Sequence, residues 1–394
     1  MSRAKFRVAI VGGGFSGTIL AVQLVRQADP ACSIILIEKN PVPGRGLAYG
    51  TECDYHRLNV TADNISVFPD DPDHFLRWAR SNYHSAVQPR GFLPRKVYGE
   101  YINFLFREAQ GLAGESTLVW KQDQALSIRL EGGLAAIQLC SGGEVRAEKI
   151  VLATGNFPPA NPAIPGRTES SRRYIPFAWS SSALEGLQQH GSILLLGSGL
   201  TSLDLALALK AKAFTGNIHI LSRHGLVPQR HQVVTPWPQF WNEQSPRTVR
   251  GMTKLIRDQV LMASEMGIDW RAVIDALRSV TPKLWQYLPL PERKRFLRHA
   301  RSYWEVHRHR VAPEIGDVIS DLIQAGQIQI HAGRIVRYRE YPGYADVTSR
   351  DRKSGLKATL RLDRMINCTG SENDCRRLDD PFLLSILFAR IGQA

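Results

Sequence analysis

The sequence is poor in the features that mark several large classes of protein. No apolar run approaches the roughly 20 residues that a membrane-spanning helix needs, and a strand-like run followed by glycines begins too early for a secretory signal. The five cysteines are scattered and include no C-x-x-C pair, which argues against a disulfide framework or a redox dithiol. No Cys/His/Asp/Glu cluster has metal-ligand spacing, and no G-x-S-x-G segment marks a serine nucleophile. We therefore expect a cytoplasmic protein without a metal.

Acidic residues are too few to balance the basic ones, and the formal net charge is +14. Residues 247–312 alone carry 14 Lys/Arg against 6 Asp/Glu, in a stretch whose apolar and aromatic residues recur at helical spacing. Such a basic face is more often solvated, or attracts anionic ligands, than it binds nucleic acid. We expect a small-molecule partner, no nucleic acid and no membrane, while the oligomeric state stays open.

A glycine turn between two apolar strands lies near the N-terminus. Residues 7–11 (RVAIV) and 33–37 (SIILI) have the composition of buried parallel strands, and a helical pattern follows the turn GGGFSG. In a G-x-G-x-x-G fingerprint the glycines permit a tight turn, the approach of a pyrophosphate and close packing of the helix. An acid at the end of the second strand accepts hydrogen bonds from ribose hydroxyls. The sequence therefore predicts a dinucleotide site formed by Gly12, Gly14, Ser16, Gly17 and Glu38.

A second glycine turn, GSGLTS, lies between the strand-like runs 192–196 and 217–221. Its third glycine is replaced by serine, and the acid typical of NAD sites is absent from the end of the second strand. Arg223 stands there instead, with a planar donor fork suited to the 2′-phosphate of NADPH. We predict a site for NADPH, with NADH as the alternative. Its residues are Gly197, Gly199, Thr201, Ser202 and Arg223.

The order of the two turns assigns their cofactors. Because a second fingerprint follows, we assign FAD to the first turn. The segment VLATGN (151–156) supports this assignment, since it resembles the segment in which two-dinucleotide flavoproteins leave the FAD domain, and it adds Thr154 and Gly155 to the expected FAD site. The chain is thus expected to be an α/β protein with two Rossmann-like dinucleotide-binding domains, in which a nicotinamide passes a hydride to a flavin.

The acceptor of the electrons decides the function. Disulfide reductases need a pair of cysteines beside the flavin, and the spacing of the cysteines provides none. A monooxygenase that uses oxygen is favoured. An electron-transfer reductase and a non-catalytic flavoprotein remain as alternatives.

Several segments outside the two turns have distinctive patterns. They are GRGLAYGT (44–51), LNV (58–60), FPDDPDHF (68–75), PRKVYG (94–99), LSRHGLVP (221–228), DWRAV (269–273) and WEVHRHR (304–310). In these segments the chain resembles a bacterial FAD/NAD(P)-binding monooxygenase family that includes an FAD-dependent urate hydroxylase and L-aspartate N-monooxygenases that form nitrosuccinate. The resemblance implies hydroxylation of a nitrogen-rich metabolite, with conversion of urate to 5-hydroxyisourate as the first hypothesis and N-hydroxylation of an aspartate-like amine as the second.

Some of these segments supply further candidate residues. Arg45 is expected beside a phosphate of FAD, and Asn59, which we expect to be a buried amide, beside the flavin ring. On a helix, His307 and Arg310 would share one face and Trp304 and Arg308 another, so this segment is the candidate site for an anionic, planar or dicarboxylate substrate. The sequence identifies no catalytic residue.

The expected domain boundaries follow the motifs. Residues 1–157 form the first part of the FAD domain, with strands expected at 125–130, 134–139 and 145–152. Residues 158–334 form the nicotinamide domain with a helical insertion at 247–324, in which Asp269 is expected to cap one helix and Pro313 to begin another. Residues 335–394 are expected to return to the FAD domain, through a strand at 365–370 and a helix at 381–391. Proteins of the resembled family continue with a further strand and helix against the flavin, so the returning part is expected to be short at its C-terminus.

Overall fold

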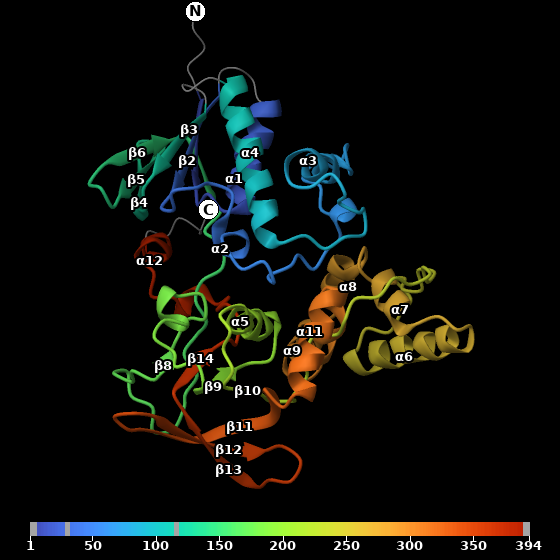
Figure 1. Cartoon of the computed structure of the whole chain (residues 1–394). Coiled ribbons are helices and arrows are strands. Elements are labelled where there is room, and N and C mark those ends of the chain that lie inside the picture. The colour runs from blue at the N-terminus through green and yellow to red at the C-terminus, as the bar shows by residue number, and fades with distance from the viewer. Residues whose placement is uncertain (1–5, 28–31, 114–117, 389–394) are drawn as a thin grey trace, which may run out of the picture. The chain divides into compact units, whose positions relative to one another are not determined.

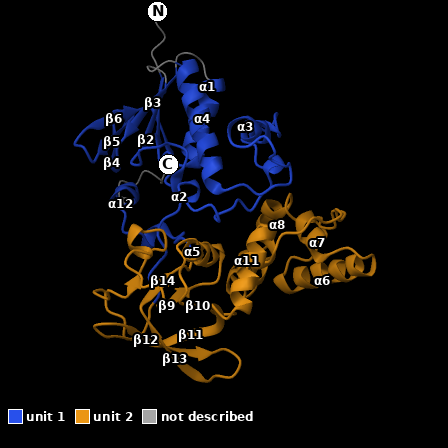
Figure 2. Ribbon diagram, in the orientation of Figure 1, with its two compact units in different colours: residues 1–162, 370–394 blue, residues 163–369 orange. Residues whose placement is uncertain are grey.

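The computed structural model describes residues 6–27, 32–113 and 118–388 of the chain (Figure 1). The chain forms two compact units, which Figure 2 shows in different colours. Unit 1 contains residues 1–162 and 370–394, and unit 2 contains residues 163–369. The return to unit 1 therefore comes about 35 residues later than the sequence suggested, because residues 335–369 build strands of the unit 2 sheet.

Unit 1 is built around a parallel sheet with the order β3-β2-β1-β7. Its strands are β1 (Phe6–Val11), β2 (Cys32–Glu38), β3 (Leu118–Gln122) and β7 (Lys149–Leu152). Alternate residues of β1 point to opposite faces, and both faces are buried: Val8 and Ile10 belong to one apolar cluster, whereas Ala9 and Val11 belong to another. Burial on both sides explains why β1 and β2 are almost continuously apolar.

Helices cover one face of this sheet and an antiparallel meander covers the other. The helices are α1 (Phe15–Gln27), α2 (Gly46–Tyr49), η1 (Ala62–Asn64), α3 (His74–Asn82) and α4 (Arg95–Ala113). The meander is formed by β4 (Ala125–Glu131), β5 (Leu134–Leu139) and β6 (Glu144–Ala147). Helix α12 (Pro381–Phe388) packs on β4 and places Phe382 in the same core. The last part of the expected helix, residues 389–391, lies outside the described residues.

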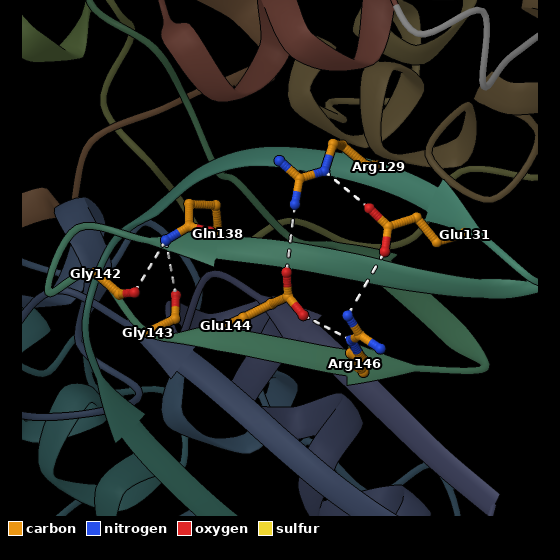
Figure 3. A network of polar contacts seen from close by, with 7 residues as sticks. All are labelled: Arg129, Glu131, Gln138, Gly142, Gly143, Glu144 and Arg146. Carbon is orange, nitrogen blue, oxygen red and sulfur yellow. Dashed lines mark hydrogen bonds and ion pairs between the residues drawn. The ribbon is translucent and has the colours of Figure 1, made fainter.

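The strand expected to run through residues 145–152 is in fact two strands in different sheets. Glu148 separates β6 from β7, and its backbone N–H donates to the Arg7 carbonyl while its carboxylate accepts from the Arg7 N–H at 2.7 Å. This reciprocal pairing with β1 turns the chain from the meander into the parallel sheet. The exposed face of the meander carries a network of alternating charges formed by Arg129, Glu131, Glu144 and Arg146 (Figure 3). Such solvated pairs contribute little stability individually.

Unit 2 contains a larger sheet with the order β13-β12-β11-β10-β9-β14-β8. Its strands are β8 (Tyr174–Ile175), β9 (Ser192–Leu196), β10 (Asn217–Ser222), β11 (Ile328–Glu340), β12 (Ala345–Asp351), β13 (Lys357–Leu362) and β14 (Arg364–Asn367). Strands β8, β14, β9, β10 and the first part of β11 are parallel, and β12 and β13 form an antiparallel hairpin on β11. The segment expected to return to the FAD domain, 365–370, thus contributes β14 to unit 2.

The helices of unit 2 include the expected insertion. Apart from η2 (Ser181–Ala183), they are α5 (Leu200–Ala211), α6 (Val249–Glu265), α7 (Trp270–Ala276), α8 (Thr281–Tyr287), α9 (Leu290–His299), α10 (Arg301–Arg308) and α11 (Pro313–Gln324). The side chain of Asp269 caps α7, and Pro313 is the first residue of α11, as their sequence predicts. A short helix η3 (Cys375–Arg377) lies in unit 1. Within the described residues, every helix is too short or too polar to cross a bilayer.

Candidate functional site

The first glycine of each turn occupies a position that no other residue fits. Gly12 and Gly197 have φ angles of 103° and 110°, a region that side chains disfavour. A Cβ on Gly12 would lie 2.2 Å from the carbonyl oxygen of Ala153, and a Cβ on Gly197 would lie 2.6 Å from that of Cys368. In both units, therefore, a backbone carbonyl at the end of the neighbouring strand lies directly against the glycine turn.

The remaining glycines of the first turn shape a surface for a phosphate group. A Cβ on Gly17 would lie 1.9 Å from the Gly12 carbonyl oxygen, so only glycine allows α1 to start this close to β1. Gly14 differs, because the nearest atom to its ideal Cβ is the Cα of Gly46 at 3.7 Å. Gly14 is therefore in ordinary contact with the loop and partly exposed, beside the N-terminus of α1, where free N–H groups and the helix dipole favour an anion. This arrangement fits the pyrophosphate of a dinucleotide.

Glu38 lies at the end of β2 and is buried against the same turn. One of its carboxylate oxygens accepts a hydrogen bond from the Gly13 N–H at 2.6 Å, and the other accepts from the backbone and side chain of Asn40. A Cβ on Gly13 would lie 2.6 Å from the Glu38 Cβ. Gly13 is therefore as constrained as its neighbours, although its position in the fingerprint gave no reason to single it out. The acid both fixes the turn and keeps unused acceptor capacity for a ribose.

The loop that contains Arg45 lies against the turn. The Gly44 N–H donates to the Gly13 carbonyl at 2.8 Å, which joins this loop to the fingerprint. The Arg45 guanidinium contacts Glu52 at 3.2 Å through one nitrogen, while its buried Nε has no partner within the described residues. A cation with spare donors therefore lies on the loop that meets the turn, and its contact with a phosphate stays a prediction.

Thr154 and Gly155 border an open cavity of about 340 Å³. Ser16 and Leu20 from α1 form its other side, together with the end of β7. Residues of the predicted FAD site from two distant segments are thus close to one another, around the N-terminal end of α1. Asn59 departs from expectation, since it is exposed rather than buried. Its amide does not need an internal partner and is free to meet a ligand.

The second turn is similar but more open. No atom of the described residues lies within 4 Å of an ideal Cβ on Gly199, so the backbone at the start of α5 is exposed. Ser202 replaces the third glycine, and its buried hydroxyl donates to the Gly197 carbonyl at 2.6 Å. The serine therefore bridges helix and turn by a hydrogen bond, where Gly17 allows direct contact. Thr201 lies in the first turn of α5 and is partly exposed.

Arg223 directly follows β10 and is exposed. The preceding Ser222 accepts hydrogen bonds from the hydroxyl of Ser198 at 2.8 Å and from the Gly225 N–H at 3.0 Å. These contacts fix the loop after β10 to the glycine turn. The guanidinium of Arg223 is consequently placed beyond the end of the second strand, where a Rossmann fold positions the adenosine ribose.

The structure keeps three of the four candidate substrate residues, Trp304, His307 and Arg308, on helix α10 and removes Arg310 from it. Helix α10 ends at Arg308, so Arg310 does not continue the helical face of His307. The His307 ring packs edge-on against Trp270 at 4.8 Å and its Nδ1 meets the Tyr303 carbonyl at 2.7 Å. Helical spacing alone placed these residues together, because the sequence contains no strong signal for the helix end.

Arg310 is instead buried within unit 2, with 2% of its surface exposed. It forms an ion pair with Asp275, which also accepts from Arg278 at 2.5 Å, and two guanidinium nitrogens of Arg310 lack a partner within the described residues. These cations hold the pKa of Asp275 below its ordinary value although burial raises it. Trp304 and Arg308 are partly exposed on α10. Across the described part of the chain, no three His, Cys, Asp or Glu side chains gather as a metal site requires.

Residues 9–157 match a family described as FAD-NAD(P)-binding. No curated protein matches the sequence. The fold is similar to L-lysine 6-monooxygenase from Pseudomonas syringae, with a TM-score of 0.63 and 15% identity over 97% of this chain and 84% of that one. It is also similar to the ornithine hydroxylase PvdA from Pseudomonas aeruginosa, with a TM-score of 0.61 and 14% identity over 97% and 85%.

A third similar structure is DfoA, described as the cadaverine monooxygenase of desferrioxamine biosynthesis from Erwinia amylovora and bound to FAD. Its TM-score is 0.58, with 14% identity over 93% of this chain and 78% of that one. At these identities the likeness concerns the fold. Residues 9–157 thus match the FAD-NAD(P)-binding family, and the chain shares, along nearly its whole length, the fold of these three proteins.

Proposed function

We propose that this protein is an FAD-dependent monooxygenase that uses NAD(P)H and oxygen to hydroxylate the nitrogen of a small amine. The observation that carries the proposal is the pair of glycine turns, one in each unit, each at the start of a helix and each closed by a carbonyl at the end of a neighbouring strand. Two dinucleotide sites in one chain suit an enzyme that passes a hydride from one cofactor to another. The shared fold with lysine, ornithine and cadaverine monooxygenases supports the choice of reaction.

In this proposal unit 1 holds FAD. The pyrophosphate lies on Gly14 and the N-terminus of α1, Glu38 accepts the ribose hydroxyls, and Arg45 neutralises a phosphate. Ser16, Gly12, Gly17, Thr154 and Gly155 shape the pocket, and Asn59 offers an amide to the flavin. When bound, FAD accepts a hydride and activates oxygen. The protein's own contribution is to orient the cofactor and to exclude water from the reacting centre.

Unit 2 holds the nicotinamide cofactor. Gly199 and the N-terminus of α5 receive its pyrophosphate, with Thr201 beside them and with Gly197 and Ser202 fixing the turn. Arg223 binds the 2′-phosphate, which makes NADPH the preferred reductant over NADH.

The substrate in the proposal is an amine, and urate is the alternative. The resemblance in sequence suggested urate first, but the three similar structures described above are named as monooxygenases or hydroxylases of lysine, ornithine and cadaverine. The α10 side chains Trp304, His307 and Arg308 are proposed to contact the substrate, and Arg310 to hold that segment in place through Asp275.

The test combines a spectrum with a substrate screen. Purified protein is expected to carry FAD and to lose its visible flavin absorbance when NADPH is added without oxygen. In air, lysine, ornithine, cadaverine, aspartate and urate are then compared for NADPH consumption, and products are identified by mass as substrate plus one oxygen. Urate consumption with no amine product would overturn the amine version. NADPH consumption without any oxygenated product would favour an electron-transfer reductase, and a colourless protein would refute the flavoenzyme proposal.

A further inference from the structure

A second arginine lies beside the end of β10, although it is far from Arg223 in sequence. Arg352 is the first residue after β12, and its backbone N–H donates to the Ala332 carbonyl at 2.9 Å. Ala332 in turn pairs with Ser222, the last residue of β10. The tip of the β12–β13 hairpin is thus attached to the sheet one strand away from the residue that precedes Arg223.

The loop after β10 and the hairpin tip meet at Ala332. Gly225 has a φ of 64°, and an ideal Cβ on it would lie 3.1 Å from the Ala332 Cβ. The loop therefore packs against the same residue whose carbonyl holds Arg352. Since Ser222 is also hydrogen-bonded to Ser198 in the glycine turn, the turn, the loop and the hairpin tip form one continuous set of contacts.

The conformation of the hairpin tip is fixed by its own acid. The carboxylate of Asp351 accepts hydrogen bonds from the N–H groups of Lys353 and Ser354 at 2.9 and 2.7 Å, and from the Ser354 hydroxyl at 2.8 Å. These bonds hold the pKa of Asp351 below its ordinary value. The carboxylate of Asp351 is therefore engaged with the residues that follow Arg352 in the turn.

Arg223 and Arg352 both affect the pKa of His224, and neither has an ion-pair partner within the described residues. Partial burial and the positive charges of Arg352 and Arg223 together hold the pKa of His224 below its ordinary value. Both guanidinium groups are exposed, and neither has an ion pair or side-chain hydrogen bond within the described residues. Arginines without an ion-pair partner leave positive charge on the loop after β10 and on the hairpin tip, and a bound anion would offset it.

We propose that Arg352 forms, with Arg223, a two-arginine clamp for the 2′-phosphate of the nicotinamide cofactor. The inference rests on the proposed function, because it concerns the same nicotinamide site. A phosphate dianion has enough acceptor oxygens for two guanidinium groups, and one arginine from the loop after β10 with one from the hairpin tip approach it from different strands. Arg352 is thus a further residue that selects NADPH over NADH.

The clamp is tested with 2′,5′-ADP and ADP, which differ only in the position of one phosphate group. Calorimetric titration of the FAD-loaded full chain is compared for wild type, Arg352→Ala, Arg223→Ala and a control, Lys357→Ala. Lys357 is an exposed cation of the same hairpin, at the far end of its turn. Arg352→Ala is expected to weaken 2′,5′-ADP binding by about five- to tenfold, the range of one exposed charge-assisted contact, while ADP binding and Lys357→Ala stay near wild type.

Each outcome has a separate meaning. If Arg352→Ala keeps the wild-type preference for 2′,5′-ADP while Arg223→Ala loses it, the clamp is wrong and the NADPH site stands on Arg223 alone. If the wild type itself does not distinguish the two nucleotides, both the clamp and the preference for NADPH are refuted. Reduction of FAD by NADH in the same preparation would then show that the flavoenzyme proposal survives. The conservative substitution Arg352→Lys should retain part of the affinity, which a purely structural role would not predict.

Discussion

Two glycines of the second turn make opposite predictions when each is changed to alanine. Gly197 has a positive φ and a carbonyl oxygen 2.6 Å from its ideal Cβ, whereas Gly199 has a φ of −78° and no atom within 4 Å. Alanine at 197 should therefore damage the fold. Alanine at 199 should leave the fold intact and place a methyl group on the surface where a pyrophosphate would rest.

The structure sets the expected magnitudes. For Gly197→Ala, a left-handed backbone costs about 1–2 kcal/mol, and displacement of the strand carbonyl adds to it, giving about 2–4 kcal/mol in total. In a unit of this size that lowers the midpoint of unfolding by about 5–15 °C. For Gly199→Ala, the loss of a favourable N-cap costs about 0.5–1 kcal/mol, and the smaller entropy of the unfolded chain returns about 0.4–1 kcal/mol. These two contributions to the free energy of unfolding nearly cancel, so Gly199→Ala should be about as stable as the wild type.

The binding effect of Gly199→Ala is expected to be large. A methyl group that holds the phosphate away from the helix N-terminus removes at least one charge-assisted hydrogen bond, about 1.5–3 kcal/mol. That corresponds to a roughly tenfold or greater increase in the NADPH concentration that gives half-maximal reduction of FAD. Anaerobic stopped-flow reduction measures this concentration, and thermal unfolding followed by circular dichroism measures stability.

One result would refute the reasoning. If FAD in Gly199→Ala is reduced at wild-type NADPH concentrations, no cofactor phosphate approaches this turn, and unit 2 is not the nicotinamide site. Equal stability of Gly197→Ala and wild type would instead show that the carbonyl of Cys368 does not close the turn. The FAD content of both variants should match the wild type, because unit 1 contains a separate turn.

Two further predictions concern ionisable groups buried in unit 2. Asp275→Ala should lower the free energy of unfolding by about 3–5 kcal/mol, because it leaves the buried guanidinium of Arg310 without its acceptor, as urea denaturation would measure. His219 lies 3.1 Å from His331, and burial lowers its pKa to about 4. Because this value lies below that of the unfolded chain, stability should fall as pH decreases from about 6.5 to 4, by up to about 3 kcal/mol, and urea denaturation at about pH 7.5 and 5, on either side of the unfolded pKa, would detect the loss.

Matched variants separate these effects from general damage. Glu305→Ala removes a half-exposed partner of Arg301 on α10 and should change stability by less than about 1 kcal/mol. A comparable loss from Glu305→Ala and Asp275→Ala would show that burial of the second pair is unimportant. His219→Leu should flatten the dependence on pH, and an unchanged slope would assign the acid sensitivity to other groups.

The sequence predicted features that depend on neighbouring residues. The strand–turn–helix context of Gly12 and Gly197, the cap at Asp269 and the helix start at Pro313 are local, and each is present in the structure. The break at Glu148 was missed because it depends on pairing with Arg7, 141 residues away. A strand pattern contains no information about which sheet the strand joins.

In the candidate site, too, the sequence did not predict contacts between residues that are far apart in the chain. Gly13 and Arg352 were not singled out, because the contact with Glu38 and the bond to Ala332 both join separate parts of the chain. Arg310 was placed on a helix by its spacing, but the helix ends at Arg308 and the buried guanidinium of Arg310 pairs with the partly exposed Asp275. The pattern of residues 365–370 predicts a strand but not the sheet that it joins. The pairing of β14 with β9 assigns this strand to unit 2.

The two turns perform the same structural task and differ in charge at equivalent positions. Glu38 lies 26 residues after Gly12, and Arg223 lies 26 residues after Gly197. In unit 1 the acid itself ties the strand end to the turn through Gly13. In unit 2 that task is performed by hydroxyl groups, those of Ser198 and Ser222, and the arginine directly follows the second of them.

Because the two serines make this connection, Arg223 is not needed to hold the turn of unit 2 in place. An arginine in the place of Glu38 could not accept the N–H of Gly13, so unit 1 cannot exchange its acid for a cation without losing the closure of its turn. In unit 2 the hydrogen bond between Ser198 and Ser222 connects the glycine turn to the end of β10. An arginine after β10 therefore does not weaken this contact. The position that we propose to meet the ribose can then carry a positive charge, which would suit a cofactor bearing a 2′-phosphate.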